Sequence, residues 1–506
     1  MPASPSTARA INDRLALRLL QQEGPLTAGR LKQLTGLSRP TVADLVERLA
    51  ASGLITVVGE AGEVRRGPNA KLYGIVADRA HLAALDVRTE GVSVVVSDLV
   101  GRVLAEASMP IGGDTGTGPA VEQTVALVER VAKEAGADRL HTVGIGAPGL
   151  IDPATGELRD STGLPEWHRR LVAALQERLP EARVSIENET NLAALAEQRD
   201  GTARDRDTFV LLWLSHGTGA AVVLDGKLRR GASGGTGEIG FLPVPGTTGL
   251  PSATDCEGGF HSLAGAAAIG GLAGEWGMPA GGGDSTGEGT DGATAAALVR
   301  VAVAAVREGA GGGGGADAGG VVVPRAGNVA VGGASGGDGG GVVAGSGVLV
   351  PGAGNLAVGE STGADGGGMI AGSGVPGAGS LAAGGSGGAD ADATAAAAGP
   401  VVPDGATPAF GPEVAAHFLD ALADRLAIGV ASVVAVLDPG CVVLGGEVGQ
   451  AGGAELARRV QARVRRMSPL ATEVRPSVLG GAAVLRGALL TARERAQDEL
   501  FAPAER

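Results

Sequence analysis

Apolar side chains follow two different patterns along the chain. In the first 50 residues they recur every three or four positions, as in amphipathic helices, whereas from about residue 80 they form short runs separated by glycine turns. The early stretch NDRLALRLLQQEG places Leu15, Leu19 and Leu20 on one helical face and ends at Gly24. This pattern predicts a short first helix.

Two further helices with a tight turn between them are predicted next. Thr27 and Ser38 suit N-caps on either side of a turn at residues 35–37. The helix after Ser38 has one apolar face, made of Val42, Leu45, Val46 and Leu49. The order helix, turn, helix indicates a DNA-binding helix-turn-helix, whose second helix meets base edges and phosphates with its N-terminus.

A basic hairpin is predicted after these helices. Residues 53–76 hold two β-prone runs around a basic loop, which is typical of the wing of a winged helix. Residues that are expected to face solvent on the second helix and the wing are the predicted DNA contacts: Ser38, Arg39, Pro40, Thr41, Arg48, Arg65, Arg66, Asn69 and Lys71. The alternative is a three-helix bundle whose solvated hairpin serves only protein contacts.

From residue 80 the pattern predicts an α/β domain. The stretch ALDVRTEGVSVVV, residues 84–96, predicts two strands around a turn at residues 89–91. Buried strands that end in glycine turns are predicted in residues 142–158 and 433–448. A strand that opens into a helix is predicted in 184–197, and a hairpin sheet punctuated by glycines in 210–244.

Residues 309–411 differ in composition and are dominated by Gly, Ala, Ser, Val and Asp. A unit of 27 residues beginning at Val321 recurs from Val348, and a shortened copy begins at Val375. Such a tract has little large apolar surface to offset backbone ordering, so a flexible linker is predicted, with a repeat-built β solenoid as the alternative. The predicted domains are a winged helix-turn-helix at 1–78, a body at 79–308 and 412–506, and this insertion at 309–411.

The net charge of the chain is unevenly distributed, and the cysteine content is low. The chain carries a net charge of −14, of which residues 1–76 contribute +4 and the remainder −18. A basic module on an acidic body favours local rather than general binding to DNA. Two distant cysteines indicate no disulfide framework, and no stretch resembles a signal peptide or membrane span, so a cytoplasmic protein is predicted.

The order of several short motifs resembles the ROK family of repressors and sugar kinases. The motifs are SRPTV in the predicted recognition helix, RGPN before the body, GAPG, ENETN, GEIGF and LDPGCVVLGG. The resemblance spans most of residues 11–308 and 412–492. It implies an α/β body of two actin-like lobes with a sugar and ATP cleft between them, preceded in repressor members by a winged helix-turn-helix.

Two departures from the kinase members of this family concern catalysis. Those kinases have Asp-x-Gly-Gly-Thr in a phosphate-binding hairpin, whereas Asp86 here is followed by Val-Arg-Thr-Glu. Side chains in place of glycines would crowd phosphates, and Glu90 adds negative charge. Glu189 stands where the family has the aspartate that takes a proton from the sugar, and its longer side chain displaces the carboxylate. We therefore predict no catalytic residue and no enzyme.

The zinc and nucleotide sites implied by the family are also incomplete. Phe241 stands at the position of a histidine ligand, and of the cysteines only Cys256 is left, with His261 nearby in sequence. Two potential ligands do not close a tetrahedral site, so no metal is predicted. Glycines at residues 216–219 and 445–446 match nucleotide loops but also occur in ordinary turns, and no cofactor is predicted.

Positions that would contact a sugar are partly retained. The resemblance implies that Asn188 and Glu238 bond sugar hydroxyls, while Phe241 and Leu263 replace polar contacts. The predicted ligand-binding residues are Gly146, Pro148, Gly149, Asn188, Glu189 and Glu238. The alternative is structural: Glu238 would cap a loop, and Asn188 would satisfy backbone groups at a strand end.

These observations lead to one functional hypothesis and two alternatives. The hypothesis is a transcriptional regulator, a repressor, that binds operator DNA as a homodimer or higher homo-oligomer and responds to a sugar or sugar derivative held between its lobes. No membrane partner is predicted. The alternatives are an ATP-dependent sugar kinase that carries a DNA-binding domain, and a non-catalytic scaffold whose glycine-rich tract binds other proteins.

Overall fold

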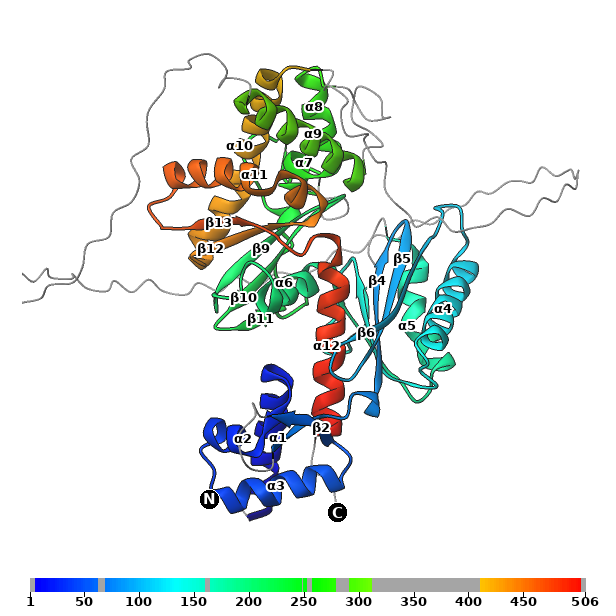
Figure 1. Ribbon diagram of the computed structural model, residues 1–506. Coiled ribbons are helices and arrows are strands. Elements are labelled where there is room, and N and C mark those ends of the chain that lie inside the picture. The colour runs from blue at the N-terminus through cyan, green and yellow to red at the C-terminus, as the bar shows by residue number, and fades with distance from the viewer. Residues whose placement is uncertain are drawn as a thin grey trace, which may run out of the picture. The chain divides into compact units, whose positions relative to one another are not determined.

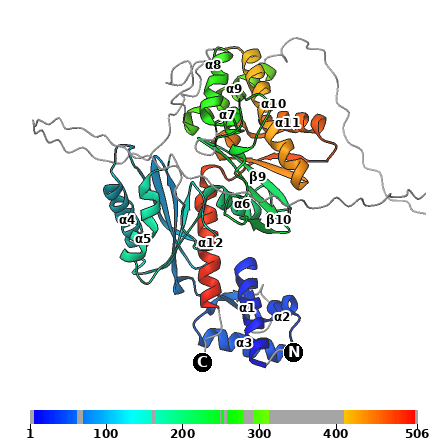
Figure 2. The same ribbon diagram turned by 180° about the vertical axis from the view of Figure 1, so that it is seen from behind.

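A computed structural model of the chain describes residues 5–61, 69–159, 164–247, 249–252, 257–278, 291–311 and 410–501. Figures 1 and 2 show its elements from two opposite sides. The glycine-rich repeats and the tip of the wing, with Arg65 and Arg66, lie outside the described residues. Within the described part of the chain, no helix is long and apolar enough to cross a membrane.

Three helices and a small antiparallel sheet form the N-terminal module: α1 (Pro5–Glu23), α2 (Ala28–Thr35), α3 (Arg39–Ala51), β1 (Leu26–Thr27), β2 (Ile55–Ala61) and β3 (Ala70–Ile75). The sheet order is β1-β3-β2. Both predicted N-caps are confirmed, because the Thr27 hydroxyl accepts from the Arg30 amide at 3.1 Å and the Ser38 hydroxyl from the Thr41 amide at 3.3 Å. The apolar face predicted for α3 is buried.

The first helix differs from its prediction in length and in its buried face. It has 19 residues and is therefore not short, although it ends before Gly24 as expected. Its core contacts come from Ala16, Leu17 and Leu20, whereas Leu15 is 39% exposed. Helical spacing alone does not decide which of several adjacent leucines faces the core; the elements that pack on α1 decide it.

Two five-stranded sheets with the same strand order follow. The first lobe contains β4 (His81–Arg88), β5 (Gly91–Asp98), β6 (Val103–Pro110), β7 (Leu140–Ala147) and β8 (Arg183–Asn188). The second lobe contains β9 (Phe209–Leu214), β10 (Thr218–Leu224), β11 (Lys227–Arg229), β12 (Cys441–Gly445) and β13 (Glu473–Pro476). The orders are β6-β5-β4-β7-β8 and β11-β10-β9-β12-β13. Each sheet thus has three antiparallel strands followed by two parallel ones, and the body repeats one topology twice.

Helices cover both sheets. In the first lobe α4 (Thr117–Glu134) and α5 (Glu166–Arg178) share a core with one face of the sheet. A second core joins the two lobes through α6 (Glu189–Asp200) and α12 (Ala483–Leu500), which contact each other and both sheets. The red helix α12 and its neighbours can be followed in Figure 1.

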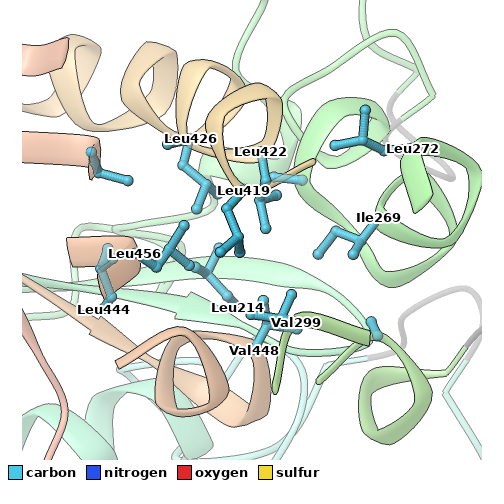
Figure 3. Close-up of a cluster of buried hydrophobic side chains, with 14 of the residues drawn as sticks. Leu214, Ile269, Leu272, Val299, Leu419, Leu422, Leu426, Leu444, Val448 and Leu456 are labelled. Carbon is cyan, nitrogen blue, oxygen red and sulfur yellow. The ribbon is translucent and has the colours of Figure 1, made fainter. Parts of the chain in front are cut away.

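The largest core lies in the second lobe. It is covered by a short α7 (His261–Ala264) and by four longer helices, α8 (Ala266–Glu275), α9 (Gly292–Gly311), α10 (Pro412–Leu437) and α11 (Gly446–Met467). Figure 3 shows Leu419, Leu422 and Leu426 of α10 directed toward Leu214 and Leu444 of the sheet. Residues 433–437 were expected in a strand but belong to α10, because the long apolar face of that helix continues through them.

The two ends of the glycine-rich insertion meet in space. A Cβ atom added to Gly309, near the end of α9, would lie 2.7 Å from Cβ of Pro412, the first residue of α10. The helices α9 and α10 also contact each other along the lobe. The chain therefore leaves and re-enters the second lobe at one point.

Helix α12 contacts the N-terminal module as well as the lobes. Gln497 Nε2 donates to Gln21 Oε1 of α1 at 2.7 Å and to the Leu99 carbonyl at 3.1 Å. Ala496 and Phe501 belong to the same buried cluster as the core of the winged helix. One helix thus reaches from the junction of the lobes to the N-terminal module.

Candidate functional site

The N-terminus of α3 forms a capped and exposed polar surface. Ser38 Oγ accepts from the Thr41 amide and also lies 2.7 Å from Thr41 Oγ1. Arg39, Pro40 and Thr41 are exposed, with Pro40 in the first turn, where a missing amide hydrogen costs little. The positive end of a helix attracts phosphate, so this surface of exposed polar side chains suits nucleic acid.

Arg48 is placed differently from the expectation that it faces solvent. It is half-buried, and its guanidinium pairs with Asp13 of α1 at 2.5 Å and with Asp44 of its own helix at 2.6 Å. Hydrogen bonds from Arg48 to both carboxylates raise the pKa of Arg48 and compensate its charge locally. Of the predicted wing contacts, Asn69 and Lys71 are exposed.

The turn after β4 carries an ion-pair cluster that joins both lobes. Arg88 Nε and Nη2 donate to Asp86 Oδ2 at 3.2 and 3.1 Å, and Arg88 Nη1 donates to Glu447 Oε1 at the start of α11. Burial raises the pKa of Asp86, and the charge of Arg88 opposes this effect. Thr89 and Glu90 are exposed at the turn and bond each other. The Arg88 side chain therefore spans from the phosphate-hairpin position to the second lobe.

Asn188 uses all of its hydrogen-bonding capacity within the protein. Its Oδ1 accepts from the amides of Thr190 at 2.9 Å and Asn191 at 3.3 Å, which caps α6. Its Nδ2 donates to the Gly149 carbonyl and to Glu189 Oε2, both at 3.1 Å. Asn188 therefore satisfies backbone groups at the end of β8, and its contact with a ligand stays a prediction.

Glu189 is held in an environment that favours its neutral form. Burial raises the pKa of the Glu189 carboxyl to about 8, and the nearby charges of Asp86 and Glu238 act in the same direction. Arg88 is close enough to oppose them. At neutral pH the carboxyl is mostly protonated, so it donates as well as accepts hydrogen bonds.

Glu238 and the glycine turn complete the set of predicted ligand-binding residues. Glu238 precedes the short helix η2 (Ile239–Phe241), and its side chain does not cap that helix. Burial raises the pKa of the Glu238 carboxyl. Pro148 is half-buried, and Gly149 has a φ of 108°, which favours glycine at this turn.

Gly146 differs from the expectation that it lines the cleft. A Cβ atom at this position would lie 2.5 Å from Val484 Cγ1 of α12 and 2.8 Å from Leu192 Cδ1 of α6. The absence of a side chain is therefore explained by the close packing of these two helices.

Several residues near the cleft were missed by sequence reasoning. Glu187 accepts from Arg230 Nε at 2.6 Å and from Asn191 Nδ2 at 3.0 Å, which ties the loop after β11 to β8. Glu447 lies opposite Arg88, and His168 Nε2 lies 3.3 Å from the Arg88 carbonyl oxygen. Glu187 stands inside the ENETN motif and could have been noticed, but no local signal marks the partners of Arg88 because they are distant in sequence.

The possible zinc ligands are described for part of the site. Within the described residues, no group of three or more His, Cys, Asp or Glu side chains is arranged for a metal ion. Phe241 and His261 are half-buried, and burial lowers the pKa of His261. Cys256 lies outside the described residues, so the lack of a zinc site stays a prediction.

Known proteins similar to this chain include transcriptional regulators. The xylose repressor of Caldicellulosiruptor bescii is 27% identical over 240 residues, and the DNA-binding transcriptional dual regulator NagC of Escherichia coli is 26% identical over 245 residues. Each match covers 47% of this chain, and 59% and 58% of those proteins. The chain thus spans less than two thirds of the length of these relatives.

Solved structures share the fold. A ROK family transcriptional regulator, described as a homolog of the E. coli MLC protein, has a TM-score of 0.62, 17% identity and 98% coverage of both chains. A ROK glucokinase from Streptomyces griseus, solved with glucose and AMPPNP, has a TM-score of 0.52 and 19% identity, and the match covers 82% of this chain and all of that one. The predicted class, a winged helix-turn-helix followed by two kinase-like α/β lobes, is confirmed.

The family models account for both parts of the chain. Residues 9–56 match a winged helix-turn-helix DNA-binding family. The ROK family model matches residues 82–277 and 409–495, which together make up more than half of the sequence. The chain belongs to the ROK family.

Proposed function

We propose that this chain is a transcriptional repressor that binds operator DNA through its winged helix and is controlled by a sugar or sugar derivative bound between its lobes. It acts in the cytoplasm as a homodimer or higher homo-oligomer. Two winged helices on a two-fold axis would read half-sites about 34 Å apart, or multiples of this spacing. The observation that carries the proposal is the capped, exposed N-terminus of α3 in a chain of this family.

The polar surface of α3 supports DNA as the partner. Ser38 and Thr41 offer hydroxyls and Arg39 a guanidinium at the positive end of the helix dipole. Asn69 and Lys71, at the base of the wing, are also exposed and polar. Arg48 contributes to it less than its charge suggests, because Asp13 and Asp44 hold its guanidinium.

The groups in the cleft support an uncharged, hydroxyl-rich ligand. Asn188, Glu189 and Glu238 supply amide and carboxyl groups at the junction of the lobes, and Glu189 is mostly neutral at pH 7. A polyol offers hydroxyls that both donate and accept, which suits such a set. Asn188 would have to exchange one of its internal bonds for a ligand contact.

A route from the cleft to the DNA-binding module is provided by α12. Val484, near its start, packs close to Gly146 in the first lobe, and Gln497, near its end, bonds Gln21 of α1. A helix of 18 residues is about 27 Å long and moves as a unit, so a displacement of one end also displaces the other. Ligand that changes the lobe junction would therefore change the position of the winged helix.

The same geometry argues against a kinase. The guanidinium of Arg88 is bonded to Asp86 and Glu447, and it occupies the turn where a kinase would bring backbone amides to phosphate. Glu189 holds its proton at neutral pH and so is a poor acceptor for a sugar hydroxyl proton. These two features support a regulator without catalytic activity.

The test is binding of the full chain to duplex DNA selected from a random pool, followed by titration with a panel of sugars. Arg39→Ala is expected to weaken binding to selected DNA by about 1–3 kcal/mol if Arg39 reads a base, or to weaken all sequences equally if it contacts phosphate. A matched control is Arg139→Ala, which removes an exposed arginine from the body.

Three outcomes are informative. Selected DNA that is released or bound more tightly in one particular sugar supports the proposal. Failure to select any sequence would contradict the DNA-binding role. Equal effects of Arg39→Ala and Arg139→Ala would remove the end of α3 from the interface.

A further inference from the structure

The end of β4 and the first turn of α11 belong to different lobes, 359 positions apart, and one ion pair joins their side chains. Arg88 comes from the first lobe and Glu447 from the second. Both side chains are half-buried, with 31% and 25% of their surface exposed. An ion pair at this depth is screened by solvent less than a surface pair is.

Contacts within the first lobe hold the side chain and the backbone of Arg88 in place. Asp86 Oδ2 accepts from two nitrogens of the guanidinium, and only 5% of the Asp86 side chain is exposed. The Arg88 backbone is held from α5, where buried His168 packs edge-on against Trp167 and directs Nε2 to the Arg88 carbonyl. The remaining nitrogen, Nη1, is thereby aimed at the second lobe.

Glu447 is fixed within the second lobe in a similar way. It lies in the first turn of α11, where the helix dipole favours a negative charge. A Cβ atom on Gly292, at the start of α9, would lie 3.1 Å from Glu447 Oε2 and 2.7 Å from the backbone nitrogen of His216. The carboxylate therefore sits where α9, α11 and the loop after β9 converge, and its buried Oε2 has no hydrogen-bond partner among the described residues.

We propose that Asp86, Arg88 and Glu447 form an interlobe clasp that holds the two lobes closed with the chain's own charges. Opening the lobes would leave Asp86 and Arg88 in one lobe and an unpaired Glu447 in the other, which is costly for groups at this depth. Among the described residues, Arg230 and Glu187 form another pair between the lobes, with 44% and 12% of their side chains exposed. The clasp does not depend on the proposed function.

The test measures the distance between the lobes in the full chain. Spin labels are placed at Glu134→Cys on α4 and Arg466→Cys on α11, both exposed. Cys256→Ser avoids a third label, and the remaining native cysteine, Cys441, is buried. Double electron–electron resonance then reports the distribution of distances. Arg88→Ala and Glu447→Gln are each expected to broaden this distribution and shift it to longer distances, and the double variant to shift it no further than the larger single effect.

The matched control is Arg463→Ala. Arg463 also bridges two carboxylates, Asp420 and Asp424, but all three lie within the second lobe. This variant is expected to leave the distances unchanged. Unchanged distances in both Arg88→Ala and Glu447→Gln, or additive shifts in the double variant, would overturn the clasp. If Arg88→Ala does not fold, Glu447→Gln alone decides, because it removes the charge and keeps the shape.

Discussion

Replacing Glu189 with Gln tests the electrostatics of the cleft without changing its shape. The Glu189 carboxyl has an ordinary pKa of 4.5, and burial raises it to about 8 in the folded chain. Between these values the folded state binds one proton that the unfolded state has released. Stability contributed by this group is therefore present at low pH and is lost as pH rises through 8, at a rate of at most about 1.4 kcal/mol per pH unit.

His168 sets the lower limit of the useful pH range. Burial lowers the pKa of His168 to about 4 from an ordinary 6.5, so below pH 6.5 the unfolded chain binds the extra proton and stability falls as pH falls. Between pH 6.5 and 8 this residue is neutral in the folded state and at least half neutral in the unfolded state, and its effect is the same in Glu189→Gln. Over that range the Glu189 term amounts to about 2 kcal/mol.

Urea unfolding followed by tryptophan fluorescence is the assay. Trp213 belongs to the same buried cluster as Leu192 of α6, so it reports on the element that carries Glu189. Relative to Glu189→Gln, the unmodified chain is expected to lose about 2 kcal/mol of stability from pH 6.5 to 8. Glu181→Gln, at an exposed carboxyl, serves as the control and keeps the original slope. Parallel slopes for the unmodified chain and Glu189→Gln would refute the reasoning.

Two further predictions concern the insertion and catalysis. Deletion of residues 312–405 is expected to leave the lobes folded and to raise stability by at most about 2 kcal/mol, because the insertion ends meet at Gly309 and Pro412 and loop length acts only logarithmically; an insoluble product would contradict this. The unmodified chain is expected to show no ATP-dependent phosphorylation of common hexoses, and turnover in the 1–10³ s⁻¹ range would favour the kinase alternative. Glu189→Asp alone is not expected to create activity, whereas its combination with Arg88→Gly, Thr89→Gly and Glu90→Thr has the better chance.

Local features of the N-terminal module and of the strands could be predicted from the sequence. The caps at Thr27 and Ser38, the apolar face of α3 and the hairpin around residues 89–91 depend on contacts within a few residues or on the period of one element. Such interactions are encoded by neighbours in the sequence. The motifs that indicated the ROK family are likewise short stretches of neighbouring residues.

The side-chain partners in the cleft and around α3 depend on tertiary structure. Arg48 has the pattern of a solvent-facing residue, but Asp13, 35 positions earlier, neutralises it. Asn188 belongs to a family motif, yet its side-chain amide donates to the Gly149 carbonyl and accepts from the first amides of α6. No local sequence pattern indicates which distant residue contacts a given side chain.

The sequence by itself indicated the winged helix-turn-helix, the α/β class of the body and the departures at residues 87–90 and Glu189. Only the tertiary structure decided that Leu15 is exposed, that Gly146 serves helix packing and that Arg88 meets Glu447 across the lobes. The physical reason is the range of the interactions. Helix and strand periods arise from neighbouring residues, whereas burial and charge pairing arise when segments hundreds of positions apart pack together.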